Sequence, residues 1–163
     1  MEKDLYEILI EYILEDQKRF YRLAYSYVQN KDDALDIVQN AICKALERYE
    51  TLRDAGAVRA WFYRILVNES LAVLKKKKEV PLPDDGAGGE IPYHEKGYEI
   101  QDDLYEQINR LNEEVQTVIK LRFYEEMTLQ EIAQITGANL NTVKARLYRG
   151  LKTLKQNIQE VDA

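Results

Sequence analysis

Apolar side chains recur at helical spacing through most of this 163-residue chain. In the N-terminal half, aliphatic and tyrosine residues stand three or four positions apart, which places them on one face of a helix. The pattern predicts one or two helices over residues 4–28, a helix over about 34–49 and another over about 59–78. The intervening TLRDAGAV of residues 51–58 is a loop by composition. This half of the chain is therefore expected to be a helical bundle.

The helix expected over residues 34–49 has an apolar and a polar side, and Asp32 or Asp33 is expected to cap it. The buried side is expected to consist of Leu35, Val38, Ile42, Ala45, Leu46 and Tyr49. The outward side is expected to carry Asp33, Asp36, Gln39, Asn40 and Glu47. These acids fit two interpretations equally: a solvated face that compensates the helix dipole, or a surface for a partner.

The stretch TLQEIAQITGANLNTVKARLYRGLKTL, residues 128–154, reads as two short helices joined by a tight turn. Gly137 suits a turn that needs positive φ or close approach, and Asn139 can cap the second helix. Its predicted buried stripe is Val143, Leu147, Leu151 and Leu154. The opposite face shows Asn141, Thr142, Lys144, Tyr148, Arg149 and Lys152. Such side chains contact base edges and phosphates in a major groove, so we expect a DNA-binding helix-turn-helix rather than a merely solvated hairpin.

Three consecutive aromatics, Trp61, Phe62 and Tyr63, begin the helix expected over residues 59–78. They cannot all point inward, so at least one is expected at the surface, where it could stack on unpaired bases. The others would fill the core between helices. The helix ends in four lysines, residues 75–78, which are favourable at a helix C-terminus and attract phosphate.

A polar segment divides the chain. Every proline and most of the glycines lie between residues 80 and 101, a stretch too polar and too broken to pack on its own. The fold class expected is all-α, with two small helical domains at residues 1–78 and 102–163. A flexible acidic linker over residues 79–101 would join them.

The net charge of −6 is unusual for a protein that binds DNA, because affinity comes largely from neutralised phosphates. The charges are segregated, however: basic residues gather over residues 59–78 and 144–155, and acids over 79–114 and in the N-terminal third. This polarity predicts a protein that holds DNA weakly by itself and needs a larger partner.

Candidate catalytic chemistry is sparse. Cys43 and His94 are each the only residue of their type, and the sequence has no glycine-rich phosphate loop. We therefore expect no enzyme activity, no disulfide, no metal site and no cofactor. The N-terminal segment mixes acids with its apolar residues, so it is neither a signal peptide nor a membrane span, and we expect a cytoplasmic protein.

Three segments, in this order, carry a family resemblance: DDALDIVQNAICKAL, VRAWFYRILVNESLAVLKKKK and LNEEVQTVIKLRFYEEMTLQEIAQITGANLNTVKARLYRGLKTL. They resemble RNA polymerase sigma factors of the sigma-70 family, in the compact extracytoplasmic-function class that keeps only the domains called sigma-2 and sigma-4. The run FYRLAYSYVQNKDDALDIVQN is most similar to the sigma-V type. The resemblance implies promoter-specific transcription initiation, in a response to cell-envelope stress.

The resemblance also implies partners: core RNA polymerase, contacted at its clamp coiled coil and flap, and promoter DNA. A membrane-bound anti-sigma factor would hold the protein inactive, and no small-molecule substrate is expected. The positions matching the clamp-docking motif are Asp33, Asp36, Ile37, Val38, Gln39 and Asn40, the last standing where the family usually has Glu. The positions matching −10 recognition and melting are Leu52, Arg53, Trp61, Arg64 and Asn68.

The −35 element would be read by Thr142, Lys144, Ala145, Tyr148, Arg149 and Lys152. Two of these depart from the family pattern, since Ala145 stands where many members have Ser and Lys144 where many have Arg. A lysine lacks the two-pronged guanidinium that pairs with guanine, so Arg149 becomes the best candidate for a specific base contact. The rival interpretations are a conventional dimeric helix-turn-helix regulator and a helical adaptor without a DNA role.

Overall fold

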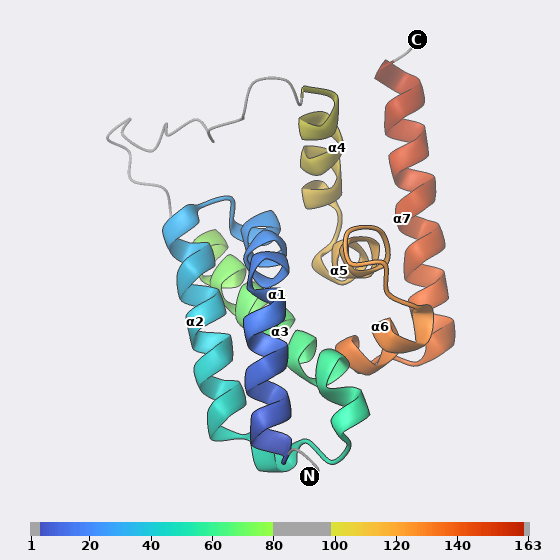
Figure 1. The fold of residues 1–163 in the computed structure, drawn as a ribbon. Coiled ribbons are helices and arrows are strands. Elements are labelled where there is room, and N and C mark those ends of the chain that lie inside the picture. The colour runs from blue at the N-terminus through green and yellow to red at the C-terminus, as the bar shows by residue number, and fades with distance from the viewer. Residues whose placement is uncertain (1–3, 80–98, 162–163) are drawn as a thin grey trace.

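A computed structural model describes residues 4–79 and 99–161, and the elements in these ranges are helices (Figure 1). They are α1 (Leu5–Val28), α2 (Lys31–Glu47), α3 (Val58–Glu79), α4 (Glu99–Arg110), α5 (Glu113–Phe123), α6 (Leu129–Thr136) and α7 (Leu140–Val161), with the single 3-10 turns η1 (Tyr49–Thr51) and η2 (Ala55–Ala57). The expected all-α class is confirmed. Most of the expected linker, including His94, lies outside the described residues.

Helices α1, α2 and α3 pack against one another and form what we call the first unit. Asp4 caps the start of α1, since its carboxylate accepts a hydrogen bond from the Glu7 amide at 2.8 Å, and the helix is kinked at Asp16. Within the bundle the ring centroids of Phe20 and Phe62 lie 4.4 Å apart, and both residues are fully buried. Aromatic packing therefore joins α1 to α3.

The helix α2 differs in phase from the expectation. Leu35, expected in the core, is 50% exposed, whereas Ile37 is fully buried. The buried positions are Ala34, Ile37, Val38, Ala41 and Ala45. Three small alanines in this stripe let α2 approach its neighbours closely, and this close packing sets which face turns inward. The cap is Asn30, which accepts from the Asp33 amide at 3.0 Å, so the expectation of Asp32 or Asp33 was wrong.

Helices α4 to α7 form the second unit, which contains the expected helix-turn-helix in α6 and α7. Thr128 and Glu131 close a capping box at the start of α6, so two free amides of its first turn are satisfied. Gly137 ends α6 with φ +74°, as the turn required. Asn139 then accepts from the Thr142 amide at 2.8 Å and caps α7.

The buried stripe of α7 runs through Val143, Leu147, Gly150 and Leu154. Leu151, expected in this stripe, is 37% exposed. Gly150 takes the inward position because α5 lies very close there: a Cβ at Gly150 would stand 2.8 Å from Val115 Cγ1. The contact needs a residue without a side chain, which apolar periodicity does not reveal.

The two units are packed together in this structure. Their apolar side chains belong to one continuous hydrophobic cluster, and α6 lies against α3 (Figure 1). The expected domain boundaries at residues 78 and 102 remain predictions, since these contacts join the two parts rather than separate them.

Candidate nucleic-acid and partner interfaces

One face of α7 is exposed and basic. Lys144, Ala145, Tyr148, Arg149 and Lys152 are exposed, and Thr142 is half-buried. Tyr148, an aromatic residue, is 68% exposed. We call these six residues the reading face. The capped first turn of α7 and its buried stripe fix the direction of this face, so its side chains are presented on a rigid helix.

Arg146 does not belong to the reading face. Its guanidinium Nη2 lies 3.2 Å from Glu114 Oε2, so this arginine is directed toward α5. The cations on the reading face are Lys144, Arg149 and Lys152, spaced so that they follow one side of α7. This arrangement suits phosphate and base contacts along a groove.

A second candidate surface lies on α3. Arg64 and Asn68 are exposed, and Trp61 is half-buried. Spacings of three and four residues place these three side chains on neighbouring positions of one helical face. The turn between α6 and α7 lies nearby, because a Cβ at Gly137 would stand 3.7 Å from Arg64 Nη2.

The expectation for the three consecutive aromatics is met only in part. Phe62 and Tyr63 are fully buried, and Trp61 is partly buried. Tyr63 lies inside because the second unit covers α3, and its hydroxyl donates to Glu125 Oε2 at 2.8 Å. A sequence considered one helix at a time cannot reveal such a covering partner.

The loop before α3 corrects one of the expected DNA contacts. Leu52 is only 2% exposed, so in this structure its side chain packs inside and cannot reach a base. Arg53 is exposed. Asp54 accepts from the Gly56 amide at 3.0 Å and shapes the turn that follows. Leu52 therefore anchors the loop, and Arg53 is the residue that the loop presents to solvent.

The expected clamp-docking positions on α2 separate into two groups. Asp36, Gln39 and Asn40 are exposed. Ile37 is fully buried and Val38 is 8% exposed, so these two position the helix and do not form its surface, contrary to the expectation.

Asp33, another expected docking residue, is already paired within the first unit. It is half-buried and forms an ion pair with Lys77 of α3, within the first unit. Leu35, half exposed, adds an apolar side chain to the outer surface of α2. Of the expected docking positions, Asp36, Gln39 and Asn40 are thus exposed on α2, next to Leu35.

A buried lysine lies where the units meet. Lys120 of α5 is fully buried, and its Nζ donates to Ser26 O at 3.0 Å and to Gln116 Oε1 at 2.7 Å. The same Nζ lies 3.9 Å from the centre of the Tyr27 ring. Burial lowers the pKa of Lys120 to about 6, while the two acceptors and the ring face favour the ammonium and oppose part of that lowering. The Tyr27 hydroxyl is hydrogen-bonded to Thr117 Oγ1 at 2.7 Å.

A second polar group joins the units at Glu125, in the turn before α6. Its carboxylate accepts a hydrogen bond from the Tyr63 hydroxyl, and its backbone oxygen accepts one from Arg59 Nη2 at 2.9 Å. Arg59 Nη1 also lies 3.5 Å from Glu131 Oε2. Burial raises the pKa of the Glu125 carboxyl. Sequence reasoning missed both Lys120 and Glu125, and the one available signal was a lysine inside the apolar run VIKL.

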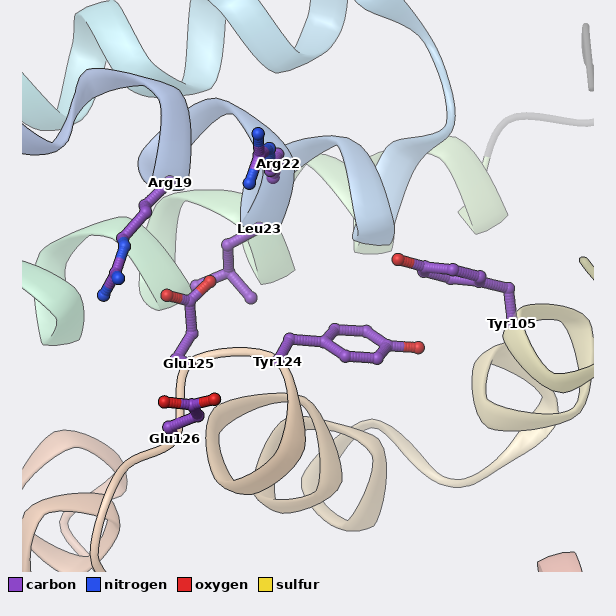
Figure 2. Close-up of a pocket in the computed structure, with 7 residues that line it drawn as sticks. All are labelled: Arg19, Arg22, Leu23, Tyr105, Tyr124, Glu125 and Glu126. Carbon is purple, nitrogen blue, oxygen red and sulfur yellow. The ribbon is translucent and has the colours of Figure 1, made fainter. Parts of the chain in front are cut away.

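A polar pocket of about 310 Å³ opens beside Glu125. Figure 2 shows it between α1, which supplies Arg19 and Arg22, and the turn that carries Tyr124 and Glu125, with Tyr105 of α4 at one side. The Glu125 carboxylate extends from the turn toward α1. The pocket therefore reaches the boundary between the two units.

Within residues 4–79 and 99–161, no group of His, Cys, Asp or Glu side chains could hold a metal ion. No helix among these residues has the length and apolar character needed to cross a membrane. Cys43 is exposed on α2.

Two family models match the chain. Residues 13–80 match sigma-70 region 2, and residues 101–154 match sigma-70 region 4. Region 2 therefore contains α2 and the surface of α3, and region 4 contains most of α7 with its reading face. A conventional helix-turn-helix regulator would not account for the first match.

Curated relatives agree over nearly the whole length. The RNA polymerase sigma factor SigV of Bacillus subtilis is 44% identical, over 95% of this chain and 93% of that protein. The ECF RNA polymerase sigma factor SigW of the same organism is 27% identical, over 88% of this chain and 84% of its own. The ECF RNA polymerase sigma-E factor of Haemophilus influenzae is 25% identical, over 94% of this chain and 95% of that protein.

Two solved structures share the arrangement of helices. The sigma factor RpoE in complex with the anti-sigma factor NepR from Bartonella quintana superposes with a TM-score of 0.72 at 26% identity, over 94% of this chain and 97% of that one. CnrH in complex with the cytosolic domain of CnrY also superposes with a TM-score of 0.72, at 17% identity, over 95% of this chain and 89% of that one. Together with the family matches, these findings show that the chain belongs to the sigma-70 family, as an ECF sigma factor that directs promoter recognition by RNA polymerase.

Proposed function

We propose that this sigma factor divides promoter recognition between two exposed surfaces: the reading face of α7 takes the −35 element, and the α3 surface takes the −10 element. The observation that carries the proposal is the reading face, where Arg149 and Lys144 are exposed on a capped helix within the region 4 match. Major-groove recognition needs this kind of rigid helix with cationic and hydrogen-bonding side chains.

Arg149 makes the specific base contact in this proposal. Its guanidinium can donate two parallel hydrogen bonds to guanine, whereas Lys144 can act only as a point charge toward a base or a phosphate. Tyr148 lies between them in the sequence and, at 68% exposure, has its ring free to pack against bases or the sugar-phosphate backbone.

The −10 element is opened at α3. Flipping a base out of the duplex costs a few kcal/mol, which contacts to the unstacked base must offset. Asn68 has the donors and acceptors to hydrogen-bond such a base, and Arg64 has the charge to hold a phosphate beside it. Arg53 in the preceding loop is the third exposed group. Leu52, buried below it, keeps the loop in place.

Core RNA polymerase docks on α2 in this proposal, with its clamp coiled coil against Leu35, Asp36, Gln39 and Asn40, while its flap contacts the second unit. The acidic character of this chain then matters less for DNA binding, because the polymerase brings its own basic channel. The net charge of −6 supports a division of labour in which polymerase holds the DNA and this chain selects the site.

An anti-sigma factor is the proposed inhibitor. RpoE of Bartonella quintana has been solved with the anti-sigma factor NepR, and its fold superposes closely on this one. Likeness to SigV supports a role in cell-envelope stress, in the cytoplasm, with the inhibitor anchored in the membrane.

The test is run-off transcription with core enzyme and three variants. Arg149→Ala and Asn68→Ala should lower promoter output while core binding is retained. A lost bidentate base contact costs about 1–3 kcal/mol, or roughly a five- to hundredfold loss at the −35 element. Asp36→Lys should instead weaken binding to core enzyme itself, measured by fluorescence anisotropy.

Two matched controls accompany these variants. Lys18→Ala removes an exposed cation from α1, outside the reading face and the α3 surface, so output should be unaltered. Glu106→Lys is the control for Asp36→Lys: it makes the same charge change at an exposed residue of α4, and binding to core enzyme should be retained. Full output from Arg149→Ala, or tight duplex binding by the wild-type chain without polymerase, would sink the proposal.

A further inference from the structure

The loop between α2 and α3 is built from two short turns. In η1 the Leu52 amide donates to the Tyr49 backbone oxygen at 3.0 Å. In η2 the Ala57 amide donates to the Asp54 backbone oxygen at 2.9 Å. Arg53 lies between the two turns and is exposed. The place where its guanidinium is presented therefore follows the place of these turns.

Two side chains attach η1 to the first unit. Leu52 is buried, so it anchors the loop from the inside. On the outside the ring of Tyr49 meets the ring of Tyr6 edge-on, with centroids 5.4 Å apart and planes at 73°. This is a favoured geometry for an aromatic pair. Tyr6 belongs to the first turn of α1, and Figure 1 shows that end of α1 beside the loop.

Tyr6 contributes little to the core of the first unit. It is 43% exposed, whereas Leu9, one turn further along α1, is fully buried. The cap at Asp4 keeps the first turn of α1 helical, which fixes the direction of the Tyr6 side chain. Loss of the Tyr6 ring should therefore leave the helical bundle folded and remove the outer support of η1.

A short series of contacts leads from Tyr6 to the DNA-facing residue of the loop. The Tyr6 ring touches the Tyr49 ring, and the Tyr49 backbone oxygen holds the amide of the residue just before Arg53. Movement of η1 away from α1 would thus displace Arg53. A loop that must become ordered while it captures an unpaired base loses conformational entropy at that moment, so a loop held in place beforehand favours capture.

We propose that Tyr6 is a positioning residue for opening of the −10 element: through Tyr49 it holds the loop that presents Arg53 to the unpaired strand. The inference rests on the proposed function, because it takes Arg53 as one of the −10 contacts. The role requires no contact of Tyr6 with DNA or with core polymerase.

The first test is amide hydrogen exchange of residues 48–57 in the free full-length chain, read by mass spectrometry. In Tyr6→Ala the loop should exchange roughly two- to tenfold faster than in wild type, the range expected for loss of one edge-to-face ring pair. Tyr6→Phe keeps the ring and should exchange at the wild-type rate. Equal exchange in Tyr6→Ala and wild type would overturn the inference.

The matched control is Leu14→Ala. Leu14 is 66% exposed and lies about 12 Å further along α1, so this change removes an apolar side chain from the same helix away from the loop. Its loop exchange should equal that of the wild type. Faster exchange in Leu14→Ala as well would mean that α1 as a whole, rather than the ring pair, governs the loop.

The second test follows opening of the −10 element by the complete holoenzyme, as the time course of permanganate reactivity of its thymines. Tyr6→Ala should open the element roughly two- to tenfold more slowly, while binding to core enzyme and to duplex promoter stays at the wild-type level. Tyr6→Phe should open it at the wild-type rate. A loss confined to promoter binding, with normal opening, would contradict the positioning role.

A double-mutant cycle separates the ring contact from a general loss of stability. Tyr49→Ala should slow opening to a similar degree, and Tyr6→Ala/Tyr49→Ala should be no slower than either single variant, because all three lack the same contact. Fully additive losses would overturn the inference. If Tyr6→Ala loses helix content by circular dichroism, Tyr6→Leu takes its place, since leucine keeps an apolar side chain without the ring.

Arg53→Ala distinguishes a failure of this inference from a failure of the proposed function. Slow opening by Arg53→Ala together with normal opening by Tyr6→Ala would overturn the role of Tyr6 alone. Normal opening by Arg53→Ala would overturn the −10 assignment of the loop and the role of Tyr6 with it. The −35 role of the reading face is independent of both results.

Discussion

Lys120 occupies a position where a lysine is costly, because a buried ammonium loses most of its hydration. Its two oxygen acceptors and the face of Tyr27 offset part of that loss. The carbonyl of Ser26 and the Tyr27 ring come from the other unit. The lysine is therefore well accommodated only when the units are together, and its protonation is coupled to their contact.

This coupling predicts a pH dependence of stability. The pKa of Lys120 is lowered from 10.5 to about 6 on burial. Between these values the unfolded chain holds up to one more proton than the folded chain, so stability should rise with pH, by at most about 1.4 kcal/mol per pH unit. We expect Lys120→Met to lose this slope, as measured by urea unfolding at pH 6.5, 7.5 and 8.5.

The comparison between wild type and Lys120→Met also removes the effect of Glu125. Burial raises the pKa of that carboxyl, so its contribution falls as pH rises above 4.5, opposite in sign to the contribution of Lys120. Both proteins retain Glu125, and its effect cancels in their difference. Parallel stability curves for the two proteins would show that Lys120 does not titrate on unfolding.

The role of a residue could be predicted from the sequence where it depends only on the local geometry of one helix or turn. Gly137 and Asn139 act locally, and their turn and cap were predicted correctly. Ile37 and Leu52 were assigned to surfaces through a resemblance, but burial depends on the neighbours that a residue meets in the fold. Lys120 escaped notice for the same reason.

At the scale of elements, the reading face depends on how closely α7 lies on α5. Gly150 allows this approach, and the buried stripe continues on either side of it. The prediction of a stripe through Leu151 was wrong by one residue. Apolar periodicity favours a leucine over a glycine at an inward position, whereas close helix packing favours the residue without a side chain.

Gly150→Ala should therefore destabilise the second unit. The added Cβ would lie 2.8 Å from Val115 Cγ1 and 3.0 Å from Ile119 Cδ1. Overpacking of this kind costs about 1–3 kcal/mol, against a gain of about 1 kcal/mol from the helix propensity of alanine. We expect a net loss of about 1 kcal/mol, read from the urea midpoint.

Gly56→Ala is the control for that change. A Cβ at Gly56 would meet its nearest neighbour, Asp54 Oδ1, at 3.4 Å, an ordinary contact distance. Its stability should stay within about 0.5 kcal/mol of the wild type. A Gly150→Ala protein as stable as this control would mean that α5 and α7 can move apart at little cost.

At the scale of the whole molecule, the candidate surfaces are open although the two units are packed together. The α2 surface is exposed, and the reading face of α7 is exposed as well. The sequence predicted the helical units and the order of their motifs, but not their contact, because residues such as Tyr27 and Thr117 meet across 90 positions of chain.

Binding to the isolated clamp coiled coil should therefore be independent of the polar contacts between the two units. Glu125→Lys removes the carboxylate that accepts from Tyr63 of the first unit. Because α2 is exposed while the units are packed together, wild type and Glu125→Lys should bind this fragment with affinities within about threefold of each other. Asp36→Lys should bind at least about tenfold more weakly, a loss of about 1.4 kcal/mol. Fluorescence anisotropy with a labelled fragment gives both comparisons. Tighter binding by Glu125→Lys would place part of the docking surface inside the boundary between the two units.

The contact between Tyr27 and Thr117 also has a consequence for synthesis. A ribosome adds about 5–20 residues per second, so these 90 residues take roughly 5–18 s to make. For that time the nascent chain has its first unit without the α5 surface that later covers Tyr27. Each new molecule thus begins with α2, the helix proposed to dock on polymerase, already made and with α5 absent, and its two units can pack together only near the end of translation.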